Sequence, residues 1–326
     1  MYTKEEMVVL SLMYSKVKKE RYVVSVFDHV ILSMMFKSSI ENNLSLFDRN
    51  NIDELSNLAL NRYELKYSVN DYEKLAKDIR AFLSAFNYRK YIREAKEEID
   101  NARRSGIRVI SYFDDEYPEI FKNLEIPPFV LYIKGNLPDI FQQQKCFSIL
   151  GSRNLENNMA NTLARSLGKE MKKIGWYNIS NMTPGASEYG HRGTIGKTGV
   201  ILGQGLNTQV LPLNNNELLD RIVENGGFII SELPLDVKVN PVGLTARNRL
   251  QVSMTKGIVV VESSKNSNAT RIAKLALENE KKVFVIEVDG ANSSENMNLF
   301  NDKIISIKTK EDFVENLKNI ETNLYT

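Results

Sequence analysis

The spacing of hydrophobic positions divides the chain at about residue 105. Before that point apolar residues recur at helical spacing, and the clearest set is Tyr72, Leu75, Ile79, Phe82, Leu83 and Phe86. No Gly or Pro occurs before Gly106, so the two strongest breakers of secondary structure are absent there. Gly106 follows the charged pair Arg103-Arg104 and suits the position after a helix end. The pattern predicts a small all-α N-terminal domain over residues 1–104.

After Gly106 short apolar runs alternate with turns and then with helical stretches. Two strands are expected at 107–110 and 129–133, on either side of Pro127-Pro128. Further strands are expected at 146–150, 176–180, 200–202, 228–231, 258–261, 283–288 and 304–307. Helices are expected at 156–174, 215–225, 268–280 and 310–320. Apolar strands that alternate with amphipathic helices predict an α/β domain over residues 105–326, with a mostly parallel sheet covered by helices on both faces.

Composition narrows the possible functions. The formal net charge of the 326 residues is only +2, so a nucleic-acid site has to be a local basic patch. Cys146 is the only cysteine, which rules out a disulfide within the chain and favours a reducing cytoplasm. His29 and His191 are far apart and no Cys/His ligand spacing occurs, so no metal site is expected. The N-terminus lacks a signal pattern and no apolar run is long enough for a bilayer, which predicts a cytoplasmic protein without membrane contact.

The turn Gly151-Ser152-Arg153 is the first candidate site. It follows an apolar strand and precedes a helix, where open α/β sheets bind their ligands. Gly151 lets the backbone approach an anion, Ser152 can donate a hydrogen bond, and Arg153 can bind phosphate through its guanidinium fork. The alternative is a tight strand-to-helix turn with an exposed arginine. The turn lacks the G-x-G-x-x-G fingerprint, so NAD is not favoured and no cofactor is expected.

Two further polar stretches follow other predicted strands. Residues 178–192 contain Pro184-Gly185 and end in His191-Arg192, where His191 either contacts a ligand or serves as a structural hydrogen-bond partner. No Ser/His/Asp spacing supports a serine hydrolase, and no catalytic residue is expected. Residues 245–249 place Arg247 and Arg249 around an asparagine, which indicates either a dense set of phosphate donors or a solvated helix start.

Two remaining stretches also allow binding. The polar loop 262–270 precedes a helix and suits an anion at the helix N-terminus. The Tyr-, Lys- and Arg-rich residues 62–93 could stack bases, but their aromatics fall on the apolar stripe, which favours core packing.

Several stretches occur in the order found in the DprA/Smf family. D-D-E-Y-P and P-P-F-V-L-Y-I-K-G, within the segment 105–140, resemble the family's lead-in segment. L-G-S-R resembles its phosphate loop, and G-K-T-G-V-I-L-G-Q-G-L-N, G-G-F-I-I-S-E-L-P, A-R-N-R and V-V-V-E-S-S-K-N-S follow as in the family. The resemblance covers residues 106–290 and implies an extended Rossmann-like domain that binds single-stranded DNA, forms homodimers and helps to load a RecA-type recombinase during transformation or recombination. The chain ends soon after this core, which implies that it lacks the winged-helix domain of some members.

The resemblance also implies a set of phosphate-binding residues. Carried over by position, they are Gly151, Ser152, Arg153, Ser180, Gly185, His191, Lys197, Arg247, Asn248, Arg249 and Ser267. The chain departs from the family pattern at three of the neighbouring positions, where it has Asn181, Ser187 and Asn268. These changes leave open whether the pocket takes DNA or a small nucleotide.

Three functions therefore compete. The first is a non-catalytic protein that binds single-stranded DNA through phosphate neutralisation. The second is a nucleotide sensor or nucleotide-processing protein, for example in a mobile-element or defence setting. The P-G-G-x-G-T-x-x-E stretch of the related phosphoribohydrolases is absent, which argues against that activity. The third is a scaffold that binds only protein.

Overall fold

The computed structural model describes residues 2–16, 29–64, 77, 80, 87–137, 145–151, 158–263, 267–287 and 304–322. The chain forms two compact units, one of Met1–Tyr132 with Glu232–Val237 and one of Ile133–Ser231 with Lys238–Thr326. The domain boundary expected after residue 104 rests on the hydrophobic pattern of the sequence and stays a prediction. The apolar stripe over residues 72–86 lies mostly outside the described residues.

The first unit begins with helices, as its apolar spacing predicts. Before residue 105 the described elements are α1 (Lys4–Lys16), α2 (His29–Glu41), η1 (Arg49–Asn51), α3 (Ile52–Glu64) and α5 (Tyr88–Arg104). They are followed by β1 (Arg108–Ser111), α6 (Glu119–Lys122) and β2 (Val130–Gly135). Helix α5 ends as expected, because Gly106 adopts φ 67° and the Ile107 amide donates to the Ala102 carbonyl (2.9 Å).

The lead-in segment contributes to the core of the first unit. Phe36 packs edge-on against Phe129, with ring centroids 5.3 Å apart. Tyr117 is buried and its hydroxyl donates to the Pro128 carbonyl (2.7 Å). A buried hydrogen bond therefore joins the Y-P and P-P stretches, and this contact gives both stretches a structural role.

A nine-stranded sheet has the order β1-β2-β6-β5-β4-β3-β7-β8-β9. The strands of the second unit after β2 are β3 (Cys146–Gly151), β4 (Tyr177–Ser180), β5 (Thr198–Ile201), β6 (Phe228–Ser231), β7 (Gly257–Glu262), β8 (Lys282–Ile286) and β9 (Ile304–Ile307). In this spatial order, every pair of neighbours from β6 to β9, which includes β5, β4, β3, β7 and β8, is parallel. The predicted α/β class with a mostly parallel, Rossmann-like sheet is confirmed.

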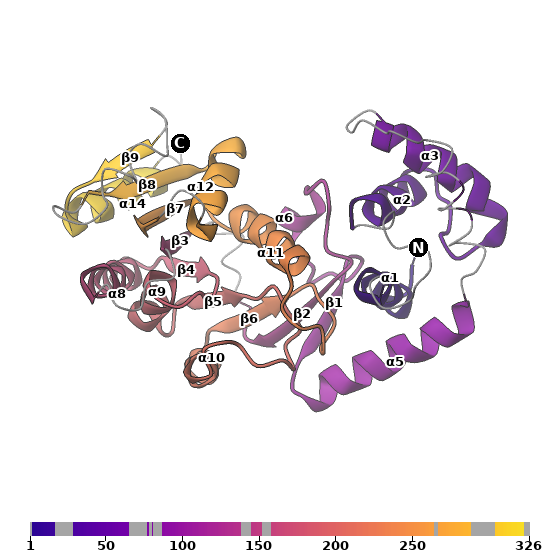
Figure 1. The fold of residues 1–326 in the computed structure, drawn as a ribbon, viewed down its shortest axis with the longest axis horizontal. Coiled ribbons are helices and arrows are strands. Elements are labelled where there is room, and N and C mark those ends of the chain that lie inside the picture. The colour runs from indigo at the N-terminus through magenta and orange to yellow at the C-terminus, as the bar shows by residue number, and fades with distance from the viewer. Residues whose placement is uncertain are drawn as a thin grey trace. The chain divides into compact units, whose positions relative to one another are not determined.

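Helices cover both faces of the central strands, whose odd and even positions are therefore both buried. The helices are α8 (Asn158–Lys173), α9 (Ala186–Thr194), α10 (Asn214–Glu224), α11 (Pro241–Ser253), α12 (Asn268–Glu278) and α14 (Lys310–Thr322). Phe147 and Val259 face a core that α8 and α14 complete. Ile258 and Val260 face the opposite core, to which α11 and α12 contribute. Figure 1 shows α8 beside α9, and α11 beside α12.

Two helices next to the sheet were not expected from the sequence. Helix α9 begins directly after Pro184-Gly185 and contains His191 and Arg192, and α11 contains the whole Arg247–Arg249 cluster. Helix α11 begins in a standard way, since the Asn240 side chain accepts a hydrogen bond from the Gly243 amide (3.0 Å) and Pro241 occupies its first turn.

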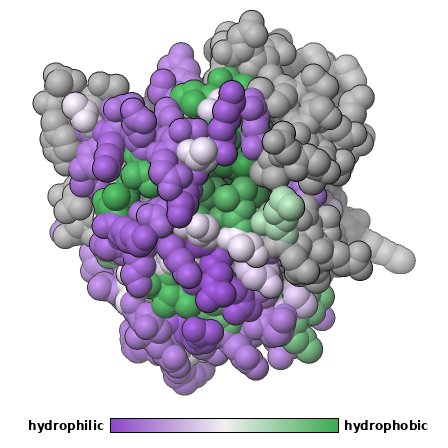
Figure 2. All heavy atoms as spheres, turned by 90° about the vertical axis from the view of Figure 1, so that its left-hand side faces the viewer, coloured by the Kyte–Doolittle hydropathy of each residue, from purple (hydrophilic) through white to green (hydrophobic). Residues whose placement is uncertain are grey.

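Hydrophilic side chains cover much of the face drawn in Figure 2, and hydrophobic side chains form patches between them. Within the described ranges of the chain, no helix has the length and apolar character needed to cross a bilayer.

Candidate phosphate-binding pocket

A cavity of about 560 Å³ lies in the second unit, where strand β3 ends and helix α12 begins. It is lined by Gly151, Thr183, Pro241, Leu244, Thr245, Arg247, Asn248, Ser267, Asn268 and Arg271. Seven of these ten residues carry hydrogen-bonding side chains, and two of the seven are arginines. We call this cavity the pocket. Its place at the carboxyl end of β3 is where parallel sheets bind their ligands.

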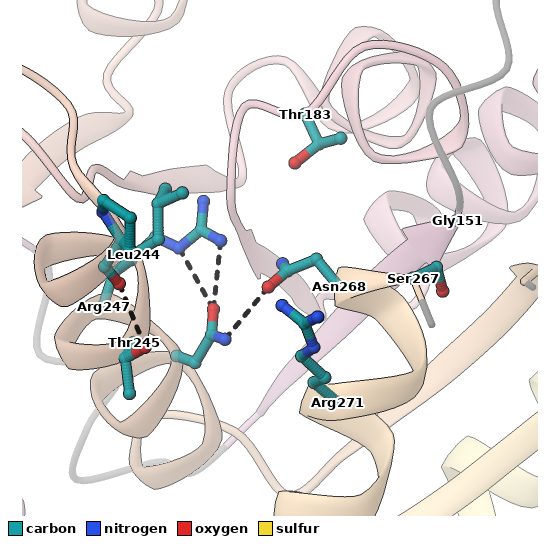
Figure 3. Close-up of a pocket in the computed structure, with 10 residues that line it drawn as sticks. Gly151, Thr183, Leu244, Thr245, Arg247, Ser267, Asn268 and Arg271 are labelled. Carbon is teal, nitrogen blue, oxygen red and sulfur yellow. Dashed lines mark hydrogen bonds between the residues drawn. The ribbon is translucent and has the colours of Figure 1, made fainter. Parts of the chain in front are cut away.

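Helix α11 supplies a buried arginine to the pocket. Arg247 and Asn248 are only 6% and 8% exposed. The Asn248 Oδ1 accepts from Nη2 (3.0 Å) and Nε (3.3 Å) of Arg247, and its Nδ2 donates to Oδ1 of Asn268 on α12 (3.1 Å). Figure 3 shows this chain of hydrogen bonds between the two helices. The bonds hold the guanidinium in one orientation, which prepares it to bind an anion without a further loss of side-chain freedom.

Helix α12 presents its amino end and a second arginine. The Ser267 hydroxyl caps the helix by accepting from the Thr270 amide (3.1 Å). Arg271, which lies four residues after the cap, lines the pocket and is exposed. Sequence analysis missed Arg271, although residues four apart share one face of a helix and the N-terminus of this helix had been singled out. The helix dipole and the two arginines together make the pocket favourable for anions.

Arg249 is not brought to the pocket. Residues two apart on a helix point about 200° apart, so Arg247 and Arg249 face different directions. The Arg249 Nη1 donates to the Ala246 carbonyl (2.7 Å) on its own helix.

Gly151 lies where β3 meets the amino end of α9. A Cβ at this position would be 2.4 Å from the Ala186 Cβ, so glycine is what allows α9 to approach the strand. Gly185 precedes α9 with φ 93° and ψ −140°, a conformation essentially reserved for glycine. Ser152 and Arg153, the other two members of the predicted turn, lie outside the described residues.

Ser180 and His191 are not among the residues that line the pocket. Both are fully buried. The Ser180 hydroxyl donates to the Ile149 carbonyl (2.9 Å), and the His191 ring lies between the Asn181 carbonyl (Nε2, 3.1 Å) and the Thr198 hydroxyl (Nδ1, 2.7 Å). These bonds give both side chains structural roles that join β3, β4, β5 and α9.

Asn181, a departure from the family pattern, connects this buried network to the pocket. Its Nδ2 donates to Gln251 of α11 (3.3 Å), and its Oδ1 accepts from the Thr183 amide (2.9 Å). Thr183 is part of the pocket lining. The asparagine therefore fixes the segment after β4 relative to α11.

Lys197 lies at the other edge of the sheet. It directly precedes β5, and its ammonium group is 4.8 Å from the ring centroid of Tyr177, the first residue of β4. The parallel strands β4 and β5 begin there, whereas the pocket lies where β3 ends. Lys197 is therefore engaged in a cation–π contact away from the pocket.

Burial of His191 makes stability depend on pH. Burial lowers the pKa of this imidazole to about 4 from the ordinary value of 6.5, despite the opposing effect of backbone hydrogen bonds. The unfolded chain therefore takes up a proton at a higher pH than the folded chain. We expect the free energy of unfolding to fall by roughly 3 kcal/mol as the pH drops from 6.5 to 4.

Urea unfolding at a series of pH values measures this effect. The His191→Gln variant lacks the group and should show a flatter pH dependence between pH 6.5 and 4. NMR titration provides an independent check, because the ring protons of His191 should not shift until the pH is well below 6. A normal titration midpoint near 6.5 would contradict the buried, neutral imidazole.

Comparison with known proteins identifies relatives of the chain. The family model described as "DNA recombination-mediator protein A" matches residues 108–318. The DNA processing protein DprA of Bacillus subtilis is 27% identical over 186 residues, which are 56% of this chain and 62% of the relative. The chain thus spans less than two thirds of that relative's length.

Two solved structures share the fold. DNA processing protein A from Streptococcus pneumoniae aligns over 96% of this chain and 98% of its own, with a TM-score of 0.69 and 16% identity. DNA processing protein A from Helicobacter pylori, in a study of its single-stranded DNA binding mode, aligns over 66% of this chain and 96% of its own, with a TM-score of 0.58 and 22% identity.

Proposed function

The chain belongs to the DNA recombination-mediator protein A family, and on this premise we propose that its pocket binds the phosphate backbone of single-stranded DNA. The observation that carries the proposal is the convergence of Arg247, Arg271 and the amino end of α12 on one cavity. Guanidinium groups bind phosphate oxygens through charge-assisted, often bidentate hydrogen bonds. The single-stranded DNA binding of the Helicobacter pylori relative supports the same class of ligand here.

The chemistry of the pocket suits binding without turnover and without reading sequence. Its donors match phosphate oxygens, which every nucleotide carries, so one oligonucleotide should bind much like another. We include in the proposal that the chain is a cytoplasmic homodimer that protects single-stranded DNA and helps to load a RecA-type recombinase. The family supports this role.

The size of the pocket favours one alternative, a small nucleotide. A cavity of about 560 Å³ falls in the range typical of small-molecule sites. In that case the same arginines would bind the phosphates of a free nucleotide.

One competition experiment separates the two ligands. Fluorescence anisotropy measures binding of a labelled oligo-dT to the protein, and unlabelled oligo-dT or deoxynucleoside monophosphates are added as competitors. We expect oligo-dT to displace the label and the monophosphates to displace it only at far higher concentration. Monophosphates that bind tightly and raise the melting temperature, without any oligo-dT binding, would support the nucleotide alternative instead.

A further inference from the structure

The outward face of α5 carries a dense set of basic side chains outside the pocket. The exposed basic residues of this helix, which we call the α5 basic face, are Arg89, Lys90, Arg93, Lys96, Arg103 and Arg104. At 100° per residue they share one arc of roughly 140°. The exposed acidic residues in this arc are Glu97 and Asp100. Six positive and two negative charges give this face of one helix a net charge of +4, whereas the whole chain carries +2.

The helix dipole does not explain the basic residues in the first half of α5. The first turn of α5 contains Arg89 and Lys90 and no acidic residue, although the helix dipole favours negative charge there. Arg89 and Arg93 are four residues apart, a spacing at which like charges destabilise a helix. In contrast, Lys172 and Lys173 at the end of α8 are placed where the dipole favours them, as are Arg103 and Arg104 at the end of α5 itself.

Ion pairs within the chain do not explain it either. Among the residues that the structure describes, Arg103 pairs with Asp100 (3.5 Å), whereas no acidic partner is found for Arg89, Arg93 or Lys96. The amino-terminal half of α5 is therefore an exposed positive surface, and an anionic partner would relieve its repulsion.

The opposite face of α5 is occupied by its own unit. Ala95 and Ala102 are fully buried, and the Glu98 carboxylate accepts from the Leu235 amide (2.7 Å). Helix α5 packs on α1, and the Tyr88 hydroxyl donates to Glu6 of that helix (2.9 Å). Since its apolar side is used in this packing, α5 cannot insert an apolar face into a lipid surface.

We propose that the α5 basic face is a second contact for the phosphate backbone of single-stranded DNA, an inference that rests on the function proposed for the pocket. Arg89, Arg93 and Lys96 form a row roughly 10 Å long, on successive turns of the helix. Such a row follows a chain of phosphates and does not match a single anion.

The test compares oligonucleotide length in a charge variant of the full chain. Arg89→Gln/Arg93→Gln/Lys96→Gln removes three charges and keeps good helix formers. We expect it to bind an oligo-dT of about 30 nucleotides roughly tenfold more weakly than the wild type, and to lower the slope of log affinity against log salt by roughly 2. An oligo-dT of about 3 nucleotides carries only as many phosphates as the two pocket arginines can bind, and it should bind as it does to the wild type.

A matched control removes the same charge elsewhere. Arg165→Gln/Lys169→Gln/Lys173→Gln takes three exposed basic residues from α8 and should leave binding of both oligonucleotides nearly unchanged. Arg89→Lys/Arg93→Lys retains the charge and should bind the long oligonucleotide as the wild type does. Melting temperatures of all variants verify that the fold is intact.

The outcomes separate the two proposals. If the wild type binds oligo-dT and the α5 variant binds each oligonucleotide as tightly as the wild type does, the α5 proposal alone is overturned. An equal loss in the α8 control would also overturn it, because net charge would then explain the effect. Loss of binding to anionic vesicles or to an acidic protein, with DNA binding unchanged, would assign the surface to that partner. If the wild type binds no oligo-dT, the function proposed for the pocket falls as well.

Discussion

Replacing Arg247 with alanine should weaken oligo-dT binding by at least about tenfold, and replacing Arg271 as well should weaken it by about 100-fold. A hydrogen bond between charged groups contributes about 1.5–3 kcal/mol, and 1.4 kcal/mol corresponds to a factor of ten. Arg247 should have the larger effect of the two because it is 6% exposed and is held by Asn248, whereas Arg271 is exposed to solvent. Fluorescence anisotropy at fixed salt measures both variants.

The neighbouring arginine provides the matched control. Arg249→Ala removes the same charge from the same helix, two residues from Arg247 and outside the pocket lining. Its oligo-dT affinity should stay within about twofold of the wild type. Equal losses at Arg247 and Arg249 would show that the general charge of α11 matters and not the pocket.

The largest expected loss of stability is at Gly193, where α9 crosses α8. A Cβ at Gly193 would lie 2.3 Å from the Arg165 carbonyl oxygen and 3.1 Å from the Gly168 Cα, both in the backbone of α8. A backbone cannot rotate away as a side chain can, so Gly193→Ala has to separate the two helices. We expect it to lower the free energy of unfolding by roughly 3 kcal/mol, measured by urea denaturation.

Gly226→Ala is the control for this prediction. Gly226 has φ 85°, and no atom lies within 4 Å of the Cβ that alanine would add. The Gly226→Ala variant should therefore lose only about 1 kcal/mol of stability, which is the strain of a non-glycine residue in the left-handed conformation. A Gly193→Ala variant as stable as Gly226→Ala would contradict the close helix contact.

The central strands could be predicted from the sequence because β3, β5, β6 and β7 are buried on both faces. Continuous apolar runs mark such strands, and the expected bounds agree with the structure at Phe228–Ser231. The expected bounds also agree at the partly buried edge strand Ile304–Ile307. The turn glycines and the amphipathic pattern of helices α8, α10 and α12 predicted the alternation of strands with helices. Together these features fix a parallel α/β domain.

Helices α9 and α11 could not be predicted from the sequence because contacts with other parts of the chain stabilise them. Helix α9 contains Gly190 and Gly193, which disfavour a helix locally but allow close packing on Ile149 of β3 and on α8, respectively. Helix α11 buries polar residues such as Gln251 and Arg247 together with apolar ones, so it shows no amphipathic stripe.

The same limit applies to the pocket. The arginine cluster was visible in the sequence, but the different directions of Arg247 and Arg249 follow only from the helix that holds them. Arg271 joins Arg247 because α11 packs beside α12, a tertiary contact that no local pattern contains. His191 stands near Gly185 in sequence, yet its ring is enclosed by β4 and β5.

The most direct test of the phosphate-binding pocket is the oligo-dT titration of the wild-type protein over a series of salt concentrations. Each phosphate that the protein neutralises on a single strand contributes about −0.7 to the slope of log affinity against log salt. The two arginines of the pocket and the basic face of α5 predict tight binding at low salt and a slope of roughly −2 to −4. Absence of binding at low salt by a folded protein, or binding that salt does not weaken, would contradict the account.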